Sequence, residues 1–403
     1  MIQLNDLQKK FVIVLSIVTV ACLVVAVSGY ELFPSVFRSA KPSTQASGSN
    51  MATRPTTLPT VAATPTFGPP PDPKVVLGID GDQPSAYPGI TWIRLNYRTC
   101  GNSHLSGGKL INKVQLYRSR GIHVLLLLCQ RPGLQLLDTT RLQDVARAGA
   151  DAVACGNEQM KHNTYTTYVP PDSFAHFFDL CQSAVHAVNP NAPVLLGSLD
   201  PHVGGIDFQP LMDQVNYLDM MEKAMNTQVH PGGHWSWRSQ TLGLIDSWHN
   251  GFPTQNTNSL QALFTFWAQQ FHVDLASGAL GQHIWVVEGT GCVYECGLNS
   301  NYQISVAHIL TLITDVQTSM HYGVPFFYFS GKDFVQQNQF WPMGVLSATG
   351  HAKPLRQDLK LGDRTLDLTC STGQVQVINQ EQLLAKLYSG CSPPGNYTTV
   401  LTN

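Results

Sequence analysis

The stretch Ala152-Val153-Ala154-Cys155-Gly156-Asn157-Glu158-Gln159 begins with a four-residue apolar run, and an Asn-Glu pair follows it after Gly156. The run has the length of a strand and no alternation of apolar and polar side chains, which is typical of a parallel strand buried on both faces. The sequence indicates seven further strands of this kind: Val75–Ile79, Thr91–Leu95, His123–Cys129, Pro193–Leu196, Leu242–Ile245, Ile284–Val287 and Pro325–Phe329.

Helical stretches separate several of these runs: Thr139–Gly149, Asp172–Val188, Phe208–Ala224, Ser259–Leu275 and Ile304–Met320. Eight strands that alternate with helices predict an α/β fold, a (β/α)8 TIM barrel, over residues 75–358. A doubly wound open sheet is the alternative. Such a sheet usually has a glycine-rich first turn, and Gly78-Ile79-Asp80-Gly81 does not match G-x-G-x-x-G.

The first crossover is short. Between Ile79 and Thr91 there is little room for a full crossover helix, which needs about ten or more residues. Either the first helix is reduced to a turn around Pro84–Pro88, or the first strand is assigned wrongly. Residues 359–403 extend past the barrel and are expected to form a tail or a small appendage.

The composition excludes two classes of protein. Apolar residues make up 43% of the 403 residues, which excludes global disorder. The 24 basic and 26 acidic residues give a net charge of −2, which excludes a generally basic nucleic-acid-binding protein. There are only six Glu, so the position of each one is informative.

Residues 1–40 are expected to be a signal or anchor segment. Phe11–Ser28 is an apolar run of 18 residues that follows Lys9 and Lys10. The run exceeds a usual signal sequence core of about 7–15 residues and reaches membrane-spanning length, which favours an uncleaved anchor with the head outside the cell. Cleavage at Ala26-Val27-Ser28 and secretion is the alternative.

Residues 41–74 are expected to be a disordered Pro/Thr-rich linker. The segment holds eight Pro and seven Thr and has no Glu. A chain of this composition buries little apolar surface and adopts extended conformations. The sequence therefore predicts an anchor, a semi-rigid stalk and a globular head.

Eight of the nine Cys lie in the head, and export would allow disulfides to form. Cys155 and Cys181 lie in apolar stretches, where buried free thiols are expected. The absence of a C-x-x-C pair argues against a zinc ribbon. Three pairs are candidates for bridges: Cys100 with Cys129, Cys292 with Cys296, and Cys370 with Cys391.

Two of the six Glu lie just after predicted strands: Glu158 three residues after the end of the fourth, and Glu288 directly after the seventh. Active sites of barrels lie at the carboxyl ends of the strands, so both side chains are expected at one mouth. Burial and a neighbouring carboxylate raise the pKa of one group and leave the other ionised. Glycoside hydrolysis requires this division between an acid and a nucleophile or base.

These motifs resemble those of the clan A glycoside hydrolases, the "4/7" superfamily of (β/α)8 barrels. The resemblance covers roughly residues 75–358, and it implies a retaining mechanism with Glu158 as general acid/base and Glu288 as nucleophile. It further implies that Asn157 bonds the sugar 2-hydroxyl and that Arg94, on the second strand, keeps Glu288 ionised. It rests on Gly156-Asn157-Glu158, Trp285-Val286-Val287-Glu288, Trp248-His249 and the stretch from Gly344-Val345-Leu346 to Gly350-His351-Ala352-Lys353-Pro354.

The sequence departs from the family pattern in two places. The family often has His-x-Tyr after strand six, whereas Phe252 here has no donor, so either His249 or Tyr294 is expected to take the place of the missing Tyr. Trp248 and His249 are expected to contact substrate. A Trp is common on strand eight, where this chain has Tyr328. Tyr328 is expected to be either a sugar platform or a core aromatic.

The glycine-rich loop 230–238 offers Trp235 and Trp237 as further sugar platforms, with packing over the barrel rim as the alternative. His230 and His234 lie in the same loop, but no third ligand at suitable spacing accompanies them, so no metal is expected. The sequence implies no cofactor.

The leading hypothesis is a retaining β-glycoside hydrolase with an extracellular oligosaccharide or polysaccharide as substrate. A transglycosylase would use the same two glutamates. A non-catalytic carbohydrate-binding surface protein on a degenerate barrel is the alternative from another class, and a metal-dependent barrel hydrolase is a third. The expected partners are the carbohydrate and, through an uncleaved anchor, the membrane, with no nucleic acid.

Overall fold

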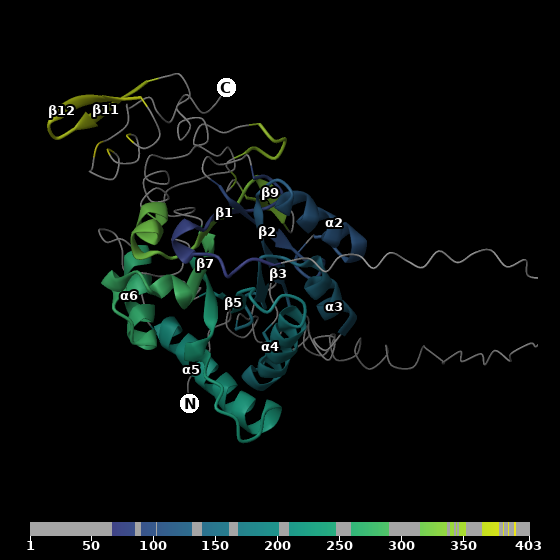
Figure 1. The fold of residues 1–403 in the computed structure, drawn as a ribbon. Helices are drawn as coiled ribbons and strands as arrows, with labels where there is room; N and C mark the ends of the chain where they lie inside the picture. The colour runs from purple at the N-terminus through teal and green to yellow at the C-terminus, as the bar shows by residue number, and fades with distance from the viewer. Residues whose placement is uncertain are drawn as a thin grey trace, which may run out of the picture. The chain divides into compact units, whose positions relative to one another are not determined.

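The computed structural model describes residues 67–84, 90–101, 103–130, 139–160, 168–200, 209–246, 259–289, 315–336, 339–341, 344, 346–351, 365–378, 382, 386 and 391 (Figure 1). The predicted anchor, most of the predicted linker and several loops after the strands lie outside these residues. In the described part of the chain, no helix is long and apolar enough to cross a membrane.

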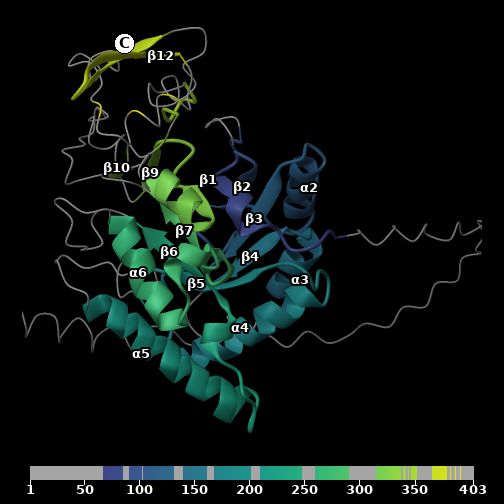
Figure 2. The same ribbon diagram turned by 60° about the vertical axis from the view of Figure 1, so that its left-hand side comes forward.

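Eight parallel strands close into a barrel in chain order, which confirms the predicted barrel (Figures 1 and 2). The first strand pairs with the second through Gly78 and Trp92, and with the eighth through Leu77 and Phe326, so its assignment was right. The strands are β1 (Leu77–Asp80), β2 (Trp92–Asn96), β3 (His123–Leu128), β4 (Ala152–Cys155), β5 (Val194–Leu199), β6 (Thr241–Asp246), β7 (Ile284–Gly289) and β8 (Phe326–Tyr328).

The helices lie around the outside of this barrel (Figures 1 and 2). Residues 315–322 are also helical and precede β8. Short turns of helix are found at η1 (Pro73–Val75), η3 (Met225–Val229), η4 (Trp237–Ser239), η6 (Leu275–Ser277) and η7 (Leu280–Gln282). The longer helices are α2 (Gly107–Arg118), α3 (Thr139–Ala148), α4 (Pro171–His186), α5 (Gln209–Ala224) and α6 (Ser259–Phe271).

Helix α4 shows how the sequence defines these elements. Pro171 lies in the first turn, where its missing N–H costs no hydrogen bond, and the helix ends shortly before Asn189-Pro190. Its buried side chains recur every three or four residues and face the barrel: Phe174, Ala175, Phe177, Phe178, Cys181 and Val185.

The barrel interior is a packed core. The Trp92 and Trp285 rings meet edge to face at 5.8 Å, and the Phe327 ring stacks on Trp285 at 6.3 Å. Glycine makes room for them, because a Cβ at Gly78 would lie 2.3 Å from the Phe327 ring. A substrate site is therefore expected at the mouth, where the strands end.

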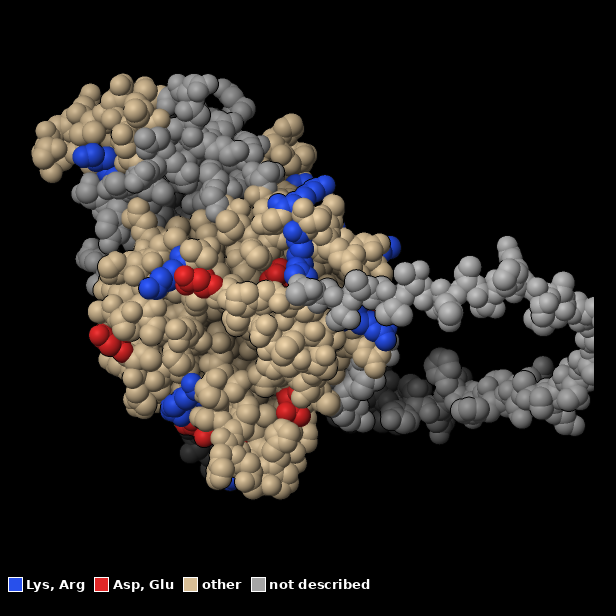
Figure 3. All heavy atoms as spheres, in the orientation of Figure 1, with Lys and Arg blue, Asp and Glu red and all other residues tan. Residues whose placement is uncertain are grey.

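Two short antiparallel pairs follow the barrel in sequence: β9 (Phe334–Gln336) with β10 (Gln339–Trp341), and β11 (Leu366–Cys370) with β12 (Gly373–Val377). The second pair shows that the region 359–403, to which the sequence assigned no structure, includes a hairpin. Charged side chains cover little of the face shown in Figure 3 and gather there in small groups, some with both signs, as a charged fraction of only 12% allows.

The last part of the expected linker contacts the barrel. The Arg118 guanidinium lies 5.1 Å from the Phe67 ring centroid, and Asn191 Nδ2 donates to Gly68 O at 3.2 Å. These residues border a cavity of about 440 Å³ near the beginnings of β2 and β3. The packed head thus includes Phe67, eight residues before the expected start at residue 75.

The described part of the chain contains three disulfides. Cys100–Cys129 and Cys370–Cys391 form as predicted. The expectation of free thiols at Cys155 and Cys181 was wrong: the end of β4 meets the inner face of α4, and the two residues form a disulfide. The candidate pair Cys292–Cys296 lies outside the described residues.

Candidate active site

The carboxyl ends of β1, β2, β4 and β7 bring polar side chains to the barrel mouth. Asp80 is the last residue of β1, Arg94 lies in β2, and Glu288 is the fifth residue of β7. Glu158 follows β4 in the turn Gly156-Asn157-Glu158. Parallel strands that share one barrel place these distant residues at a common edge.

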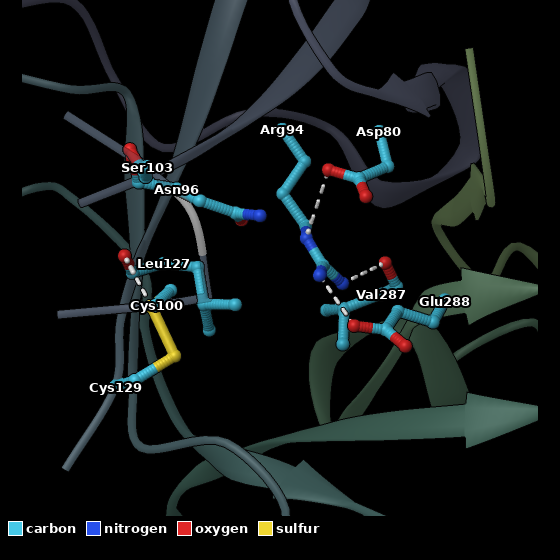
Figure 4. Close-up of polar contacts among 9 residues, drawn as sticks. All are labelled: Asp80, Arg94, Asn96, Cys100, Ser103, Leu127, Cys129, Val287 and Glu288. Carbon is cyan, nitrogen blue, oxygen red and sulfur yellow. Dashed lines mark hydrogen bonds and ion pairs between the residues drawn. A yellow bond between two sulfur atoms is a disulfide. The ribbon is translucent and has the colours of Figure 1, made fainter. Parts of the chain in front are cut away.

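Arg94 joins the first and the seventh strands. Its Nη1 donates to Val287 O at 2.7 Å, and its Nη2 donates to the Glu288 carboxylate (Figure 4). Its Nε lies 3.4 Å from Asp80 Oδ1, on the other side of the guanidinium (Figure 4). The predicted proximity of Arg94 to Glu288 is confirmed, and the catalytic roles of the two residues stay predictions.

The charges of Asp80, Arg94 and Glu288 interact strongly because the three side chains are buried or partly buried. Arg94 is 2% exposed and Asp80 is 6% exposed. Burial and the charge of Glu288 raise the pKa of Asp80 to about 6, against the lowering effects of Arg94 and the Gly81 N–H. Burial alone would lower the pKa of Arg94, but Asp80 and Glu288, and then Glu158, raise it above its ordinary value. The guanidinium therefore stays charged and serves two carboxylates.

Glu158 lies in a sharp turn after β4. Its φ of 47° is in the left-handed region, and its backbone N–H donates to Ser198 O at 2.9 Å. The Asn157 side-chain Nδ2 lies 3.5 Å from Glu158 Oε2, at the limit of a hydrogen bond. Because the charge of Glu158 also acts on Arg94, the two glutamates and the guanidinium belong to one electrostatic group.

This group has the parts needed for acid, base or nucleophilic chemistry. Glu288 has a side chain that is 15% exposed, so it is partly desolvated and still accessible. Arg94 holds the carboxylate of Glu288 by a charge-assisted hydrogen bond, which fixes its orientation. A fixed carboxylate and a second carboxyl group at the same barrel mouth are the parts that can attack a carbon centre and move a proton.

Three residues near the site were missed as functional candidates. Asp80 pairs with Arg94, and Gln130 holds the backbone of Asn157 through two hydrogen bonds. Burial, followed by the charge of Asp200, raises the pKa of Asp246 at the end of β6 to about 7. The signal that identified the two glutamates, a polar residue where an apolar run ends, was also present at Asp80 and Asp246.

Three predicted sugar platforms lie away from an accessible surface or on the wrong side of the barrel. Tyr328 is 1% exposed in β8, so the core alternative is right. Trp237 is fully buried, and its indole N–H donates to Asp219 Oδ1 at 2.8 Å. Trp235 packs on Phe178 with ring centroids 6.2 Å apart. The loop that holds Trp235 and Trp237 precedes β6. It therefore lies at the amino end of the strands, opposite the glutamates.

Trp248, His249 and Tyr294, expected near the substrate, lie outside the described residues. Over the described part of the chain, no group of three His, Cys, Asp or Glu could hold a metal ion.

No protein-family model and no curated protein matches this chain. Solved structures with a similar fold include a glucosidase from Croceicoccus marinus, with a TM-score of 0.47 and 12% identity over 70% of this chain and 65% of the glucosidase. A family 39 glycoside hydrolase from Bacteroides cellulosilyticus has a TM-score of 0.42 and 14% identity, and the match covers 77% of this chain and 69% of that enzyme.

A family 128 oligosaccharide-binding protein from Cryptococcus neoformans has a TM-score of 0.42 and 12% identity over 70% of this chain and 91% of that protein. At such identities and TM-scores these likenesses do not bear on what this chain binds or cleaves. The solved structures named here are two glycoside hydrolases and one oligosaccharide-binding protein.

Proposed function

We propose that this chain is a retaining β-glycoside hydrolase, with Glu288 as nucleophile and Glu158 as general acid/base. The observation that carries the proposal is the contact between Arg94 and Glu288. The guanidinium binds the Glu288 carboxylate and the Val287 carbonyl together, which holds the carboxylate ionised and in one orientation. An ionised and oriented carboxylate is what a glycosidase nucleophile requires.

In the first step, Glu288 attacks the anomeric carbon, and the bond from this carbon to the leaving oxygen breaks. Glu158 gives its proton to that oxygen, and a glycosyl-enzyme ester forms on Glu288. In the second step, Glu158 takes a proton from water, the water oxygen attacks the same carbon, and Glu288 is released. Two inversions at one carbon leave the configuration retained.

Asn157 and Arg94 support these steps without exchanging protons. The Asn157 amide lies beside the Glu158 carboxylate, where it would also bond the sugar 2-hydroxyl. Arg94 stabilises negative charge on Glu288 before attack and after its release. We expect the carboxyl groups of Glu158 and Glu288 to lie about 5–5.5 Å apart in a crystal structure, because a retaining nucleophile attacks the sugar carbon directly. A separation of about 6.5–9.5 Å would leave room for a water and indicate an inverting enzyme.

The substrate we propose is an oligosaccharide or polysaccharide outside the cell, reached by a head on a stalk with a single-pass N-terminal anchor. Three disulfides in the described head suit an oxidising compartment. Cell fractionation with protease added to intact cells tests the location. Head fragments released by the protease are expected, whereas a head protected until lysis would contradict it.

The activity is tested by screening the purified head on aryl β-glycosides and glycans beside Glu288→Gln. Glu222→Gln is the matched control, because Glu222 accepts bonds from Ser236 Oγ and the Trp237 N–H and touches none of the proposed catalytic residues. We expect wild type and Glu222→Gln to release product with retained configuration in a first-turnover NMR assay. Glu288→Gln should be inactive.

A 2-fluoroglycoside should trap the intermediate, and mass spectrometry should find the label on Glu288. Transfer to added sugar in place of water would identify a transglycosylase. A head that binds glycans but cleaves none would contradict the proposal and support a carbohydrate-binding role.

A further inference from the structure

In the turn after β4, Glu158 has a backbone conformation that a glutamate does not favour. Gly156 has a φ of 104°, which suits glycine, but Glu158 has a φ of 47°. A side chain other than glycine in the left-handed region is strained. Such a conformation persists only where the surrounding structure determines it. The contacts around this turn should therefore show what holds Glu158 in place.

On one side, the turn is held by a side chain from the segment after β3. Gln130 Nε2 donates to Asn157 O at 2.6 Å, and Asn157 N donates to Gln130 Oε1 at 2.8 Å. Both groups of the Gln130 amide thus bind the backbone of the residue that precedes Glu158. Gln130 is 7% exposed, so water does not compete freely for these bonds.

The amide of Gln130 continues the pairing of two strands past the point where they end. Leu128 of β3 is in register with Cys155 of β4, and Gly156 N donates to Leu128 O at 2.8 Å. One step further, the main chains separate, and the Gln130 side chain replaces the missing peptide group. An amide side chain can do this because it places a donor and an acceptor side by side.

On the other side, the turn is held by main-chain bonds. Glu158 N donates to Ser198 O at 2.9 Å, and Val169 N donates to Gln159 O at 2.8 Å. The peptide group between Asn157 and Glu158 and the peptide group that follows Gln159 are therefore both held. Gln130 is the anchor among these that a substitution can remove without changing the main chain.

We infer that Gln130 is a positioning residue for Glu158, which acts by holding the Asn157 peptide so that the acid/base carboxyl points at the leaving oxygen. The inference rests on the proposed function of Glu158. In this role Gln130 acts through the Asn157 peptide and exchanges no proton itself. Its loss should affect the step that needs proton donation and leave the attack by Glu288 nearly intact.

The test compares Gln130→Met with Gln214→Met over a series of aryl and alkyl β-glycosides. Gln214 is also buried, 2% exposed in α5, and its side-chain amide has no hydrogen-bond partner among the described residues. Its substitution therefore controls for replacing a buried amide that anchors no main chain. For Gln130→Met, kcat/KM should fall about 100-fold on alkyl glycosides, because a misplacement of about 1 Å has effects of this size. On dinitrophenyl glycosides, whose leaving group needs little protonation, it should change by less than about threefold.

Two results would overturn the inference. One is a loss of kcat/KM that is equal for all leaving groups in Gln130→Met. The other is a dependence of kcat/KM on the leaving group that changes in Gln214→Met as well. Crystal structures of the two variants provide a second measurement that needs no activity. In Gln130→Met, the Glu158 φ should leave the region near 47° and its carboxyl should move by about 1 Å, whereas Gln214→Met should leave both unchanged.

The failures of the two proposals are distinguishable. A wild type without glycosidase activity contradicts the proposed function, and the crystal structures then still decide whether Gln130 positions Glu158. An unmoved Glu158 in Gln130→Met would refute the inference in either case. If Gln130→Met does not fold, Gln130→Asn serves instead, since its shorter amide cannot reach both backbone atoms of Asn157.

Discussion

Replacing Arg94 with Met removes the cation shared by Asp80 and Glu288 and leaves an unbranched apolar side chain in its place. Breaking a buried ion pair by removing one partner costs about 3–5 kcal/mol, because the other charge stays buried without compensation. Arg94 is 2% exposed, so solvent does not screen this loss. We expect Arg94→Met to lower the free energy of unfolding by about 3–5 kcal/mol at pH 7.5.

The cost should depend on pH, and its sign follows from Asp80. The pKa of Asp80 is raised from 3.8 to about 6, so the stability associated with its protonated form is present at low pH and lost as pH rises through 6. This loss amounts to roughly 3 kcal/mol in wild type. Without Arg94, which lowers the pKa of Asp80, the carboxyl should take up its proton at still higher pH. At pH 4.5 it is then protonated and needs no cation, so only the lost contact with Glu288 remains and the cost should be smaller than at pH 7.5.

The assay is urea unfolding at pH 4.5, 6 and 7.5, followed by tryptophan fluorescence, to which the buried Trp92 and Trp285 contribute. Lys113→Met is the control, since it breaks an exposed pair with Asp82 and should cost less than about 1 kcal/mol. Adding Asp80→Asn to Arg94→Met removes one uncompensated carboxylate and should recover part of the loss at pH 7.5. A cost below about 1 kcal/mol at pH 7.5, or one that is the same at pH 4.5, would refute the electrostatic reasoning.

Three further predictions concern stability. In urea unfolding, Asp246→Asn should gain stability relative to wild type as pH rises from 5 to 8.5, because burial raises the pKa of Asp246 to about 7 and makes its ionisation unfavourable. A difference in the free energy of unfolding that does not change with pH contradicts this. Gly156→Ala should lower the melting temperature more than Gly81→Ala. The two glycines share φ values near 104°, but only at Gly156 would a Cβ lie 2.6 Å from an aromatic ring. Equal losses of melting temperature would exclude the steric contribution. A head that begins at Pro73 should keep its activity but melt below one that begins at residue 64, because it lacks the Phe67 contact with Arg118; equal melting temperatures would show that this contact adds no stability.

The sequence alone was sufficient for the barrel and for the position of both glutamates. Strands buried on both faces appear as apolar runs without alternation, and eight such runs were visible in chain order. Because parallel strands all end at one edge, a polar residue at the end of a run can be assigned to the barrel mouth without coordinates. The same rule, applied to loops before strands, would have placed Trp235 and Trp237 at the opposite end.

Only the tertiary structure decided which residues touch. Arg94 and Glu288 are 194 positions apart, and their contact depends on the strand register and on closure of β1 onto β8. The disulfide Cys155–Cys181 depends on how α4 is rotated against β4, which the apolar pattern leaves open. Gln130 reaches Asn157 because β3 and β4 end in register at Leu128 and Cys155. Such contacts depend on shifts of one residue between elements, and hydrophobic periodicity defines which face of an element is buried but not the partner it meets there.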